Sequence, residues 1–226
     1  MKKHLQNTFF SLLLLTTFLS KAQNTMAIRV GTNVANYKFY YGSAVPTWQQ
    51  LPISPYAFVT IGALIEVPIN KYSALQGEVN FVQKGFYTES GSIFGSSKNR
   101  LTVNWLDIPL LAKLRFGSRD AISGSLFFGP SLNYGLSIHI KSETITSNGQ
   151  VIITDTERTF ENTYHSQGDW SLNVGGEIGY RRVFFEARYQ IGMYNMTYRN
   201  SSGNLGTQAY NRSIALTFGY RLPFKL

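Results

Sequence analysis

Apolar and polar residues alternate along most of the chain after residue 22, and the longest alternating segment runs from Ile122 to Lys141. In this segment the even positions are mostly apolar, up to Ile140, and most of the odd positions are small or polar. A period of two over this length predicts a β-strand with one apolar and one polar face. Residues 106–116 and 183–193 repeat the pattern. Because no segment after residue 22 shows a sustained helical period, we predict an all-β fold.

The same pattern, applied to the whole chain, predicts eight strands. Their expected ranges are 26–40, 56–69, 72–87, 101–116, 122–140, 168–180, 183–199 and 209–225. Tight turns are expected at 70–71, 117–121 and 181–182, and long loops rich in Ser, Gly, Asn and Thr at 41–55, 88–100, 141–167 and 200–208. A regular meander must close to hide its edge strands. The predicted fold is therefore one eight-stranded antiparallel up-and-down β-barrel.

Three features indicate that the apolar face of this barrel points outward, to lipid. The predicted strands are longer than the usual five to six residues of globular proteins, and they suit a tilted strand that crosses a bilayer. The alternation of tight turns and long loops is typical of outer-membrane barrels. The polar face carries many small residues, such as Ser123, Ser125 and Gly129, which a narrow barrel interior requires. We predict a transmembrane barrel in the bacterial outer membrane.

Charged residues on the polar face would then lie inside the barrel. They are nearly balanced in sign, and we expect them to pair because an isolated charge in a confined interior is costly. An interior of this width is filled by its own side chains, so we expect no conduction. The predicted lumen charge network consists of Arg29, Glu66, Glu78, Lys84, Asp107, Lys113, Arg115, Glu177, Glu186, Arg188 and Arg221.

Aromatic residues gather near the predicted strand ends. Tyr56, Phe86 and Trp170 lie toward the long loops, and Tyr72 and Tyr180 lie toward the short turns. Amphipathic rings favour the headgroup region of a membrane, so the sequence predicts two aromatic girdles.

Residues 1–22 have the pattern of a cleavable signal peptide. Lys2 and Lys3 precede an apolar segment from Phe9 to Leu19, and a small-x-small cleavage site ends at Ala22. An apolar segment this short cannot cross a bilayer as a helix. The mature barrel domain would therefore span 23–226. The formal net charge of +9 includes three lysines of residues 1–22, and the remaining charges are scattered, so we expect no nucleic-acid partner.

The sequence predicts neither a catalytic site nor a cofactor or metal site. The chain has no cysteine, and its three histidines are far apart, with His4 in the predicted signal and His165 in a long loop. No nucleophile elbow, Walker loop or dinucleotide fingerprint occurs. His139, near Lys141 and Glu143, is comparable with the hydrolase constellation of barrel enzymes that modify lipid A, and an enzyme of that class stays open as an alternative.

Several segments resemble the PorT-like outer-membrane β-barrel family of Bacteroidota. The matching segments are 64–72 (LIEVPINKY), 82–86 (VQKGF), 105–116 (WLDIPLLAKLRF), 128–131 (FGPS), 186–192 (EARYQIG) and 213–221 (SIALTFGYR). The resemblance covers nearly all of residues 23–226, and it implies the same fold and location. The named member of that family is implicated in protein secretion through a type IX system and in gliding. The chain departs from many outer-membrane barrels at its end, where Phe224 lies two residues before the terminus.

These observations predict a non-enzymatic, monomeric outer-membrane barrel that contacts outer-membrane lipid. Loop 141–167, the longest, is the expected surface for a protein or cell-surface partner in a structural, adhesion or secretion-associated role. One competing function is that of a soluble periplasmic ligand carrier of the lipocalin type, whose apolar face would line a pocket. A lipid-modifying barrel enzyme and a small pore also compete with the predicted role.

Overall fold

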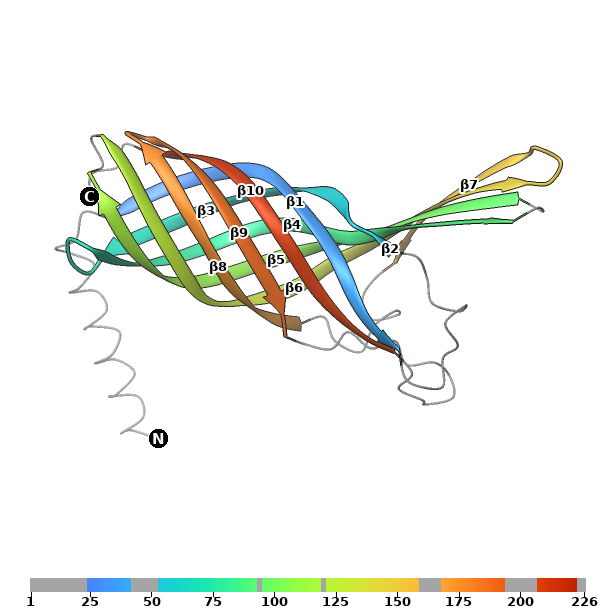
Figure 1. Ribbon diagram of the computed structural model, residues 1–226, viewed down its shortest axis with the longest axis horizontal. Helices are drawn as coiled ribbons and strands as arrows, with labels where there is room; N and C mark the ends of the chain where they lie inside the picture. The colour runs from blue at the N-terminus through green and yellow to red at the C-terminus, as the bar shows by residue number, and fades with distance from the viewer. Residues whose placement is uncertain are drawn as a thin grey trace, which may run out of the picture.

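The computed structural model describes residues 24–41, 53–92, 95–118, 121–158, 168–193 and 207–222, and these form ten antiparallel β-strands (Figure 1). The predicted signal peptide lies outside the described residues. The strands are β1 (Thr25–Tyr41), β2 (Ile53–Ser54), β3 (Tyr56–Pro68), β4 (Ser73–Ser92), β5 (Gly95–Gly117), β6 (Ile122–Thr146), β7 (Val151–Arg158), β8 (Gly168–Tyr180), β9 (Val183–Gly192) and β10 (Thr207–Arg221).

Eight of these strands close into a barrel. The pairing runs β1, β3, β4, β5, β6, β8, β9 and β10, and β10 pairs again with β1, for example Val30 with Phe218. The two remaining strands lie outside the ring, where β2 pairs with β4 and β7 pairs with β6. The predicted eight-stranded antiparallel barrel is confirmed. The end of the strand predicted at 183–199 lies outside the described residues from 194 onward.

Two of the tight turns predicted from the sequence, 70–71 and 181–182, are present at one end of the barrel, and the described residues of the third, 117–118 and 121, lie at the same end. Asn70 closes the β3–β4 turn, because its side-chain carbonyl accepts hydrogen bonds from the backbone N–H groups of Tyr72 and Ser73. Gly117, at φ 77°, leads from β5 toward β6, and Arg181, at φ 53°, lies in the turn between β8 and β9. This end also holds the start of β1 and the end of β10.

At the other end, two of the predicted long loops are largely strands. β4 continues to Ser92 and β5 starts at Gly95, so residues 88–92 and 95–100 lie in paired strands instead of a loop. Within the predicted loop 141–167, β6 continues to Thr146 and turns back as β7. Residues 88–100 are rich in Ser and Gly, and ladder hydrogen bonds with neighbouring strands outweigh their weak strand propensity. In β7 the β-branched residues Val151, Ile152 and Ile153 favour a strand by themselves. Residues 88–92, 95–100 and 139–158, from β4, β5, β6 and β7, form an arm that projects beyond the barrel (Figure 1).

The barrel is apolar outside and polar inside. Ile28, Leu126 and Phe218 are about half exposed on the outer face, whereas Asn33, Gln76 and Ser171 are buried on the inner face. Tyr56 and Trp170 at one end, and Tyr72 and Tyr180 at the other, have exposed rings, as the two girdles require. No described segment forms a helix of the length and apolarity needed to cross a membrane. This distribution is that of a barrel surrounded by lipid.

One bulge changes which residues of β6 face inward. Asn104 pairs with Ser137 but Trp105 pairs with Gly135, so Leu136 is an additional residue in β6. Beyond it the inward positions become even, because an extra residue reverses the alternation of faces. We predicted that Ile138 and Ile140 share the lipid-facing side with Ile122, and this prediction is wrong.

Ile138 instead belongs to an apolar cluster inside the barrel, next to the arm. Val103, Trp105 and Ile138 are buried there, and Phe86, Leu101 and Ile140 pack against them. The prediction of Phe86 in an aromatic girdle is therefore wrong too. Phe86 lies between Lys84 and Thr88, which are buried on the inner face, and alternate residues of a strand share a face, so Phe86 points inward.

Candidate functional site: the charged barrel interior

All eleven residues of the predicted lumen network are on the inner face of the barrel. Ten are buried, and Arg115 is partly exposed, with 20% of its side chain accessible. Successive side chains of a strand point to opposite faces, and each of these residues lies an even number of positions from other inward-facing residues of its strand, so all of them point inward. They separate along the barrel axis into a central group, a group near the short turns and a group near the apolar cluster.

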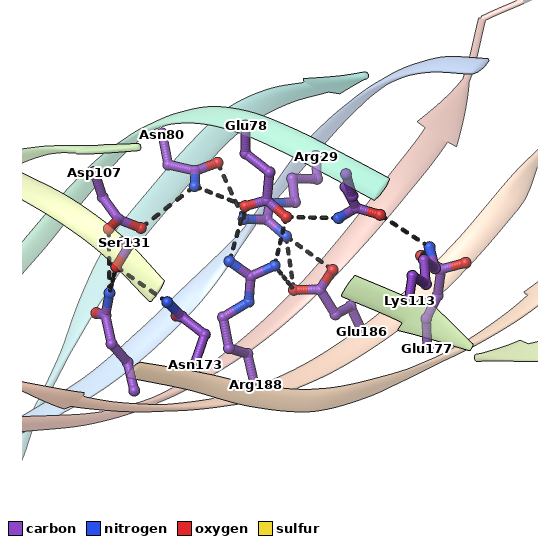
Figure 2. Close-up of polar contacts among 12 residues, drawn as sticks. Arg29, Glu78, Asn80, Asp107, Lys113, Ser131, Asn173, Glu177, Glu186 and Arg188 are labelled. Atoms are coloured by element: carbon purple, nitrogen blue, oxygen red, sulfur yellow. Dashed lines mark hydrogen bonds and ion pairs between the residues drawn. The ribbon is translucent and has the colours of Figure 1, made fainter. Parts of the chain in front are cut away.

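Two arginines and two glutamates form the central group (Figure 2). Arg29 on β1 lies 2.6 Å from a carboxylate oxygen of Glu78 on β4 and 2.6 Å from one of Glu186 on β9. Arg188 on β9 contacts the same two carboxylates, at 2.7 Å and 3.0 Å. Each charge thus touches two of opposite sign. Shared partners and bidentate geometry offset the cost of removing four charges from water.

Packing fixes the position of the Arg188 guanidinium. It lies 4.9 Å from the ring centroid of Phe127 on β6, a distance that suits a cation–π contact. The ring lies against Gly175 on β8, where a Cβ atom would approach the Phe127 Cζ atom to 2.4 Å. A side chain at residue 175 would displace the Phe127 ring, so Gly175 leaves the space in which this ring contacts Arg188.

The group near the short turns is built around Lys113 on β5. Its ammonium lies 3.0 Å from Glu66 on β3 and 2.8 Å from Glu177 on β8. Arg115 pairs with Glu66 at 3.2 Å, and Arg221 on β10 pairs with Glu177. Ion pairs between four strands thus cross-link the barrel wall at this end.

Gln76 connects this group to the central one. Its carbonyl oxygen accepts a hydrogen bond from Lys113 at 3.0 Å, and its amide donates to Glu78 at 2.6 Å. The charged network therefore continues along the barrel axis through a neutral side chain.

The third group combines Lys84 and Asp107 with amides and hydroxyls. Lys84 donates to the Gln190 carbonyl oxygen at 2.5 Å, and it lies 5.9 Å from the Trp105 ring centroid. The Gln190 amide donates to Asp107 at 3.1 Å and to Ser171 at 2.8 Å. Lys84 and Asp107 are thus joined through Gln190. This layer separates the charged centre from the apolar cluster.

The interior also holds an acid that the sequence prediction missed. Asp169 on β8 is buried on the inner face, in register with Asn133. It has the same parity as Ser171, Asn173 and Glu177, so the alternation of β8 contained the signal. With Asp169, the described interior carries six acidic and six basic side chains. The acids are Glu66, Glu78, Asp107, Asp169, Glu177 and Glu186, and the bases are Arg29, Lys84, Lys113, Arg115, Arg188 and Arg221.

Two cavities show how completely these side chains fill the barrel. In the centre, between Arg29, Asn33 and Arg188, the free volume is about 20 Å³, which is room for about one water molecule. At the short-turn end a cavity of about 250 Å³ lies among Glu66, Arg115 and other side chains. The middle of the barrel is therefore packed, whereas the short-turn end has room for several water molecules.

His139 lies outside this network, on β6 beyond the bulge. Its Nε2 atom lies 3.3 Å from the Ser137 hydroxyl and 3.5 Å from a carboxylate oxygen of Glu157 on β7. In a Ser-His-acid triad the acid contacts Nδ1 and leaves Nε2 for the serine. Here both contacts converge on one nitrogen, so this arrangement does not activate Ser137. Within the described ranges, no three His, Asp or Glu side chains gather as metal ligands would.

A β-barrel with an apolar outer face and a charged, packed interior is an integral protein of the bacterial outer membrane. Residues 22–198 match the family model described as outer membrane protein beta-barrel domain. The chain belongs to this family, and its location is the outer membrane. No curated protein has a sequence that matches it.

Several solved outer-membrane barrels are similar to the chain. OprG of Pseudomonas aeruginosa is 10% identical, with 89% of this chain and 97% of OprG covered, at a TM-score of 0.47. AlkL, solved in lipid bilayers, is 12% identical, with 91% of this chain and 94% of AlkL covered, at a TM-score of 0.42. Ail, the attachment invasion locus protein of Yersinia pestis, is 11% identical, with 88% of this chain and 99% of Ail covered, at a TM-score of 0.38.

Proposed function

We propose that the chain is a non-enzymatic, monomeric outer-membrane barrel whose arm binds a protein partner in a structural, adhesion or secretion-associated role. The observation that carries this proposal is the arm, which continues the barrel strands beyond the apolar belt. The resemblance to the PorT-like family favours the secretion-associated role among the three. A soluble carrier does not fit, because the apolar residues face outward and the interior is charged.

The β7 strand is the best candidate for the contact. Among the described residues, β7 pairs only with β6, so its other edge offers backbone N–H and C=O groups to an incoming strand. Val151, Ile152 and Ile153 are consecutive and 53%, 47% and 62% exposed. Exposed edge strands with apolar residues pair readily with other chains. The arm therefore combines backbone and apolar recognition.

Deletion of residues 145–160 tests the role of the arm. We expect the folded barrel to keep its heat-modifiable migration in gel electrophoresis, because the ring of eight strands stays intact, and we expect partner capture to be lost. A photo-crosslinking residue at Ile153 should capture a protein in intact cells, and the same residue at lipid-facing Leu132 is the control. Loss of the folded barrel upon deletion, or equal capture from both positions, would contradict the proposal.

A triple substitution separates surface chemistry from arm structure. Val151→Thr, Ile152→Thr and Ile153→Thr keep β-branching and remove most of the exposed apolar area, so the strand should persist while capture falls. Lys98→Gln, on the same arm, is the matched control and should capture normally. The enzymatic alternative is tested with His139→Ala. The lipid A mass spectrum should stay unchanged, and a change in acyl-chain content would refute the non-enzymatic role.

A further inference from the structure

The cavity of about 250 Å³ at the short-turn end is unlike the rest of the interior, because its charges do not balance. Six charged side chains line it: Lys71, Lys113, Arg115, Arg221, Glu66 and Glu177. Four are positive and two are negative, whereas the central group has two of each sign. Lys71 and Phe116 are exposed, so the cavity reaches the surface. In outer-membrane barrels the short turns face the periplasm, so the cavity faces that compartment.

Two buried donors in or beside this cavity have no hydrogen-bond partner. The Ser125 hydroxyl, in a residue only 5% exposed, is one, and the Nε–H group of Arg115 is the other. The two residues are directly paired across β5 and β6, and Ser125 is paired on its other side with Glu177. Buried donors are nearly always satisfied, and an unsatisfied one costs free energy. Both donors are on the inner face, where a ligand could satisfy them.

One basic side chain at this site, that of Arg221, is held in place by its own packing. The Arg221 guanidinium lies 5.0 Å from the Phe184 ring centroid and donates to the Arg181 carbonyl at 3.0 Å. Gly179 leaves room for it, because a Cβ atom there would approach its two terminal nitrogens to 2.8 and 2.9 Å. A preorganised positive site loses little side-chain freedom when an anion binds.

We propose that this cavity binds a phosphate group presented from the periplasmic side. The excess of two positive charges attracts an anion, and Ser125 and Arg115 supply donors that suit a ligand with several acceptor oxygens. A cavity of this volume holds such a group with some of its water. The phosphate could belong to a free anion or to a phospholipid headgroup of the periplasmic leaflet. This inference concerns the end of the barrel opposite the arm, so it is independent of partner binding.

Calorimetric titration of the full chain in dodecyl maltoside micelles, which carry no phosphate, tests the proposal with inorganic phosphate at low ionic strength. We expect saturable binding at one site per chain. Ser125→Ala should weaken it about tenfold, the contribution of one hydrogen bond to a charged group. Lys71→Gln should weaken it about threefold, because Lys71 acts through charge alone. Ser213→Ala, a buried serine of the inner face outside this cavity, is the matched control and should bind as the unmodified chain does.

A second measurement distinguishes the two sources of phosphate. If inorganic phosphate does not bind, native mass spectrometry should show one phosphatidylglycerol retained by the unmodified chain and released by Ser125→Ala and Lys71→Gln, which supports the headgroup. Neither substitution removes an ion pair, so both variants should fold. The absence of binding to both probes would overturn the proposal. Binding that Ser125→Ala and Lys71→Gln leave unchanged, or that Ser213→Ala weakens equally, would also overturn it.

Discussion

The β4 and β5 strands pass through two environments, and their charges behave differently in each. Inside the barrel, Glu78 of β4 is fully buried and lies 2.6 Å from Arg29, whose side chain is 4% exposed. In the arm, Glu89 of the same strand lies 3.8 Å from Lys98, and the two side chains are 56% and 44% exposed. The barrel encloses one face of these strands, whereas both faces of the arm can reach solvent. Charged side chains must therefore form ion pairs where the barrel encloses them, and they need not do so in the arm, where water can solvate them.

The largest expected effect comes from breaking the central group. Glu78→Leu would leave Arg29 and Arg188 with Glu186 as their only shared carboxylate, so we expect a loss of about 3–5 kcal/mol in the free energy of unfolding. Urea unfolding of the barrel in lipid vesicles, followed by tryptophan fluorescence, measures it. Glu78→Leu combined with Arg188→Met should recover part of the loss, because an apolar pair replaces an ion pair. A cost below about 1 kcal/mol for the single variant would show that enclosure does not demand pairing.

The next effect tests the boundary between the two environments. Trp105→Ala would open a cavity in the apolar cluster where the barrel continues into the arm, and we expect a loss of about 3 kcal/mol by the same measurement. Trp105→Phe should cost less, because it keeps most of the apolar volume. If the alanine and phenylalanine variants were equally stable, the cluster would not contribute packing energy to the barrel.

The smallest effect is expected in the arm. Lys98→Gln removes the exposed ion pair with Glu89, and the free energy of unfolding should change by less than about 0.5 kcal/mol, because solvent screens exposed pairs. Measurements in low and high salt should agree. A loss near that of Glu78→Leu would contradict the contrast between arm and barrel.

The interior charges could be predicted from the sequence because strand alternation assigns faces without knowledge of the partners. Glu186 and Arg188 follow directly from the period of β9. Asp169 follows from the period of β8 too, because it lies within the predicted strand 168–180 and has the parity of Ser171 and Glu177. Which charges touch could not be predicted, since Arg29 and Glu186 are 157 residues apart in sequence. Pair identity depends on barrel closure and register, which alternation does not encode.

The arm and the bulge escaped prediction for two further reasons. Residues 88–100 are rich in Ser and Gly, which favour loops, and their strands persist through pairing with neighbours. In the second segment the β-branched Val151, Ile152 and Ile153 were a strand signal that the loop prediction missed. At Leu136 the apolar and polar alternation continues undisturbed through Ile138 and Ile140. The pattern stays regular while the face it describes changes, so no local signal marks the inserted residue.

The closing pair of strands imposes an order on folding. β1 is the first strand of the barrel, and its Arg29 completes its contacts only with Glu186 of β9, near the end of the chain. Until the later strands arrive, an unfinished barrel would hold an arginine without that glutamate and a β1 edge without β10. Such long-range closure is slow. The full set of contacts of Arg29 and of the β1 edge therefore forms only in the last step of barrel closure, when β9 and β10 join β1.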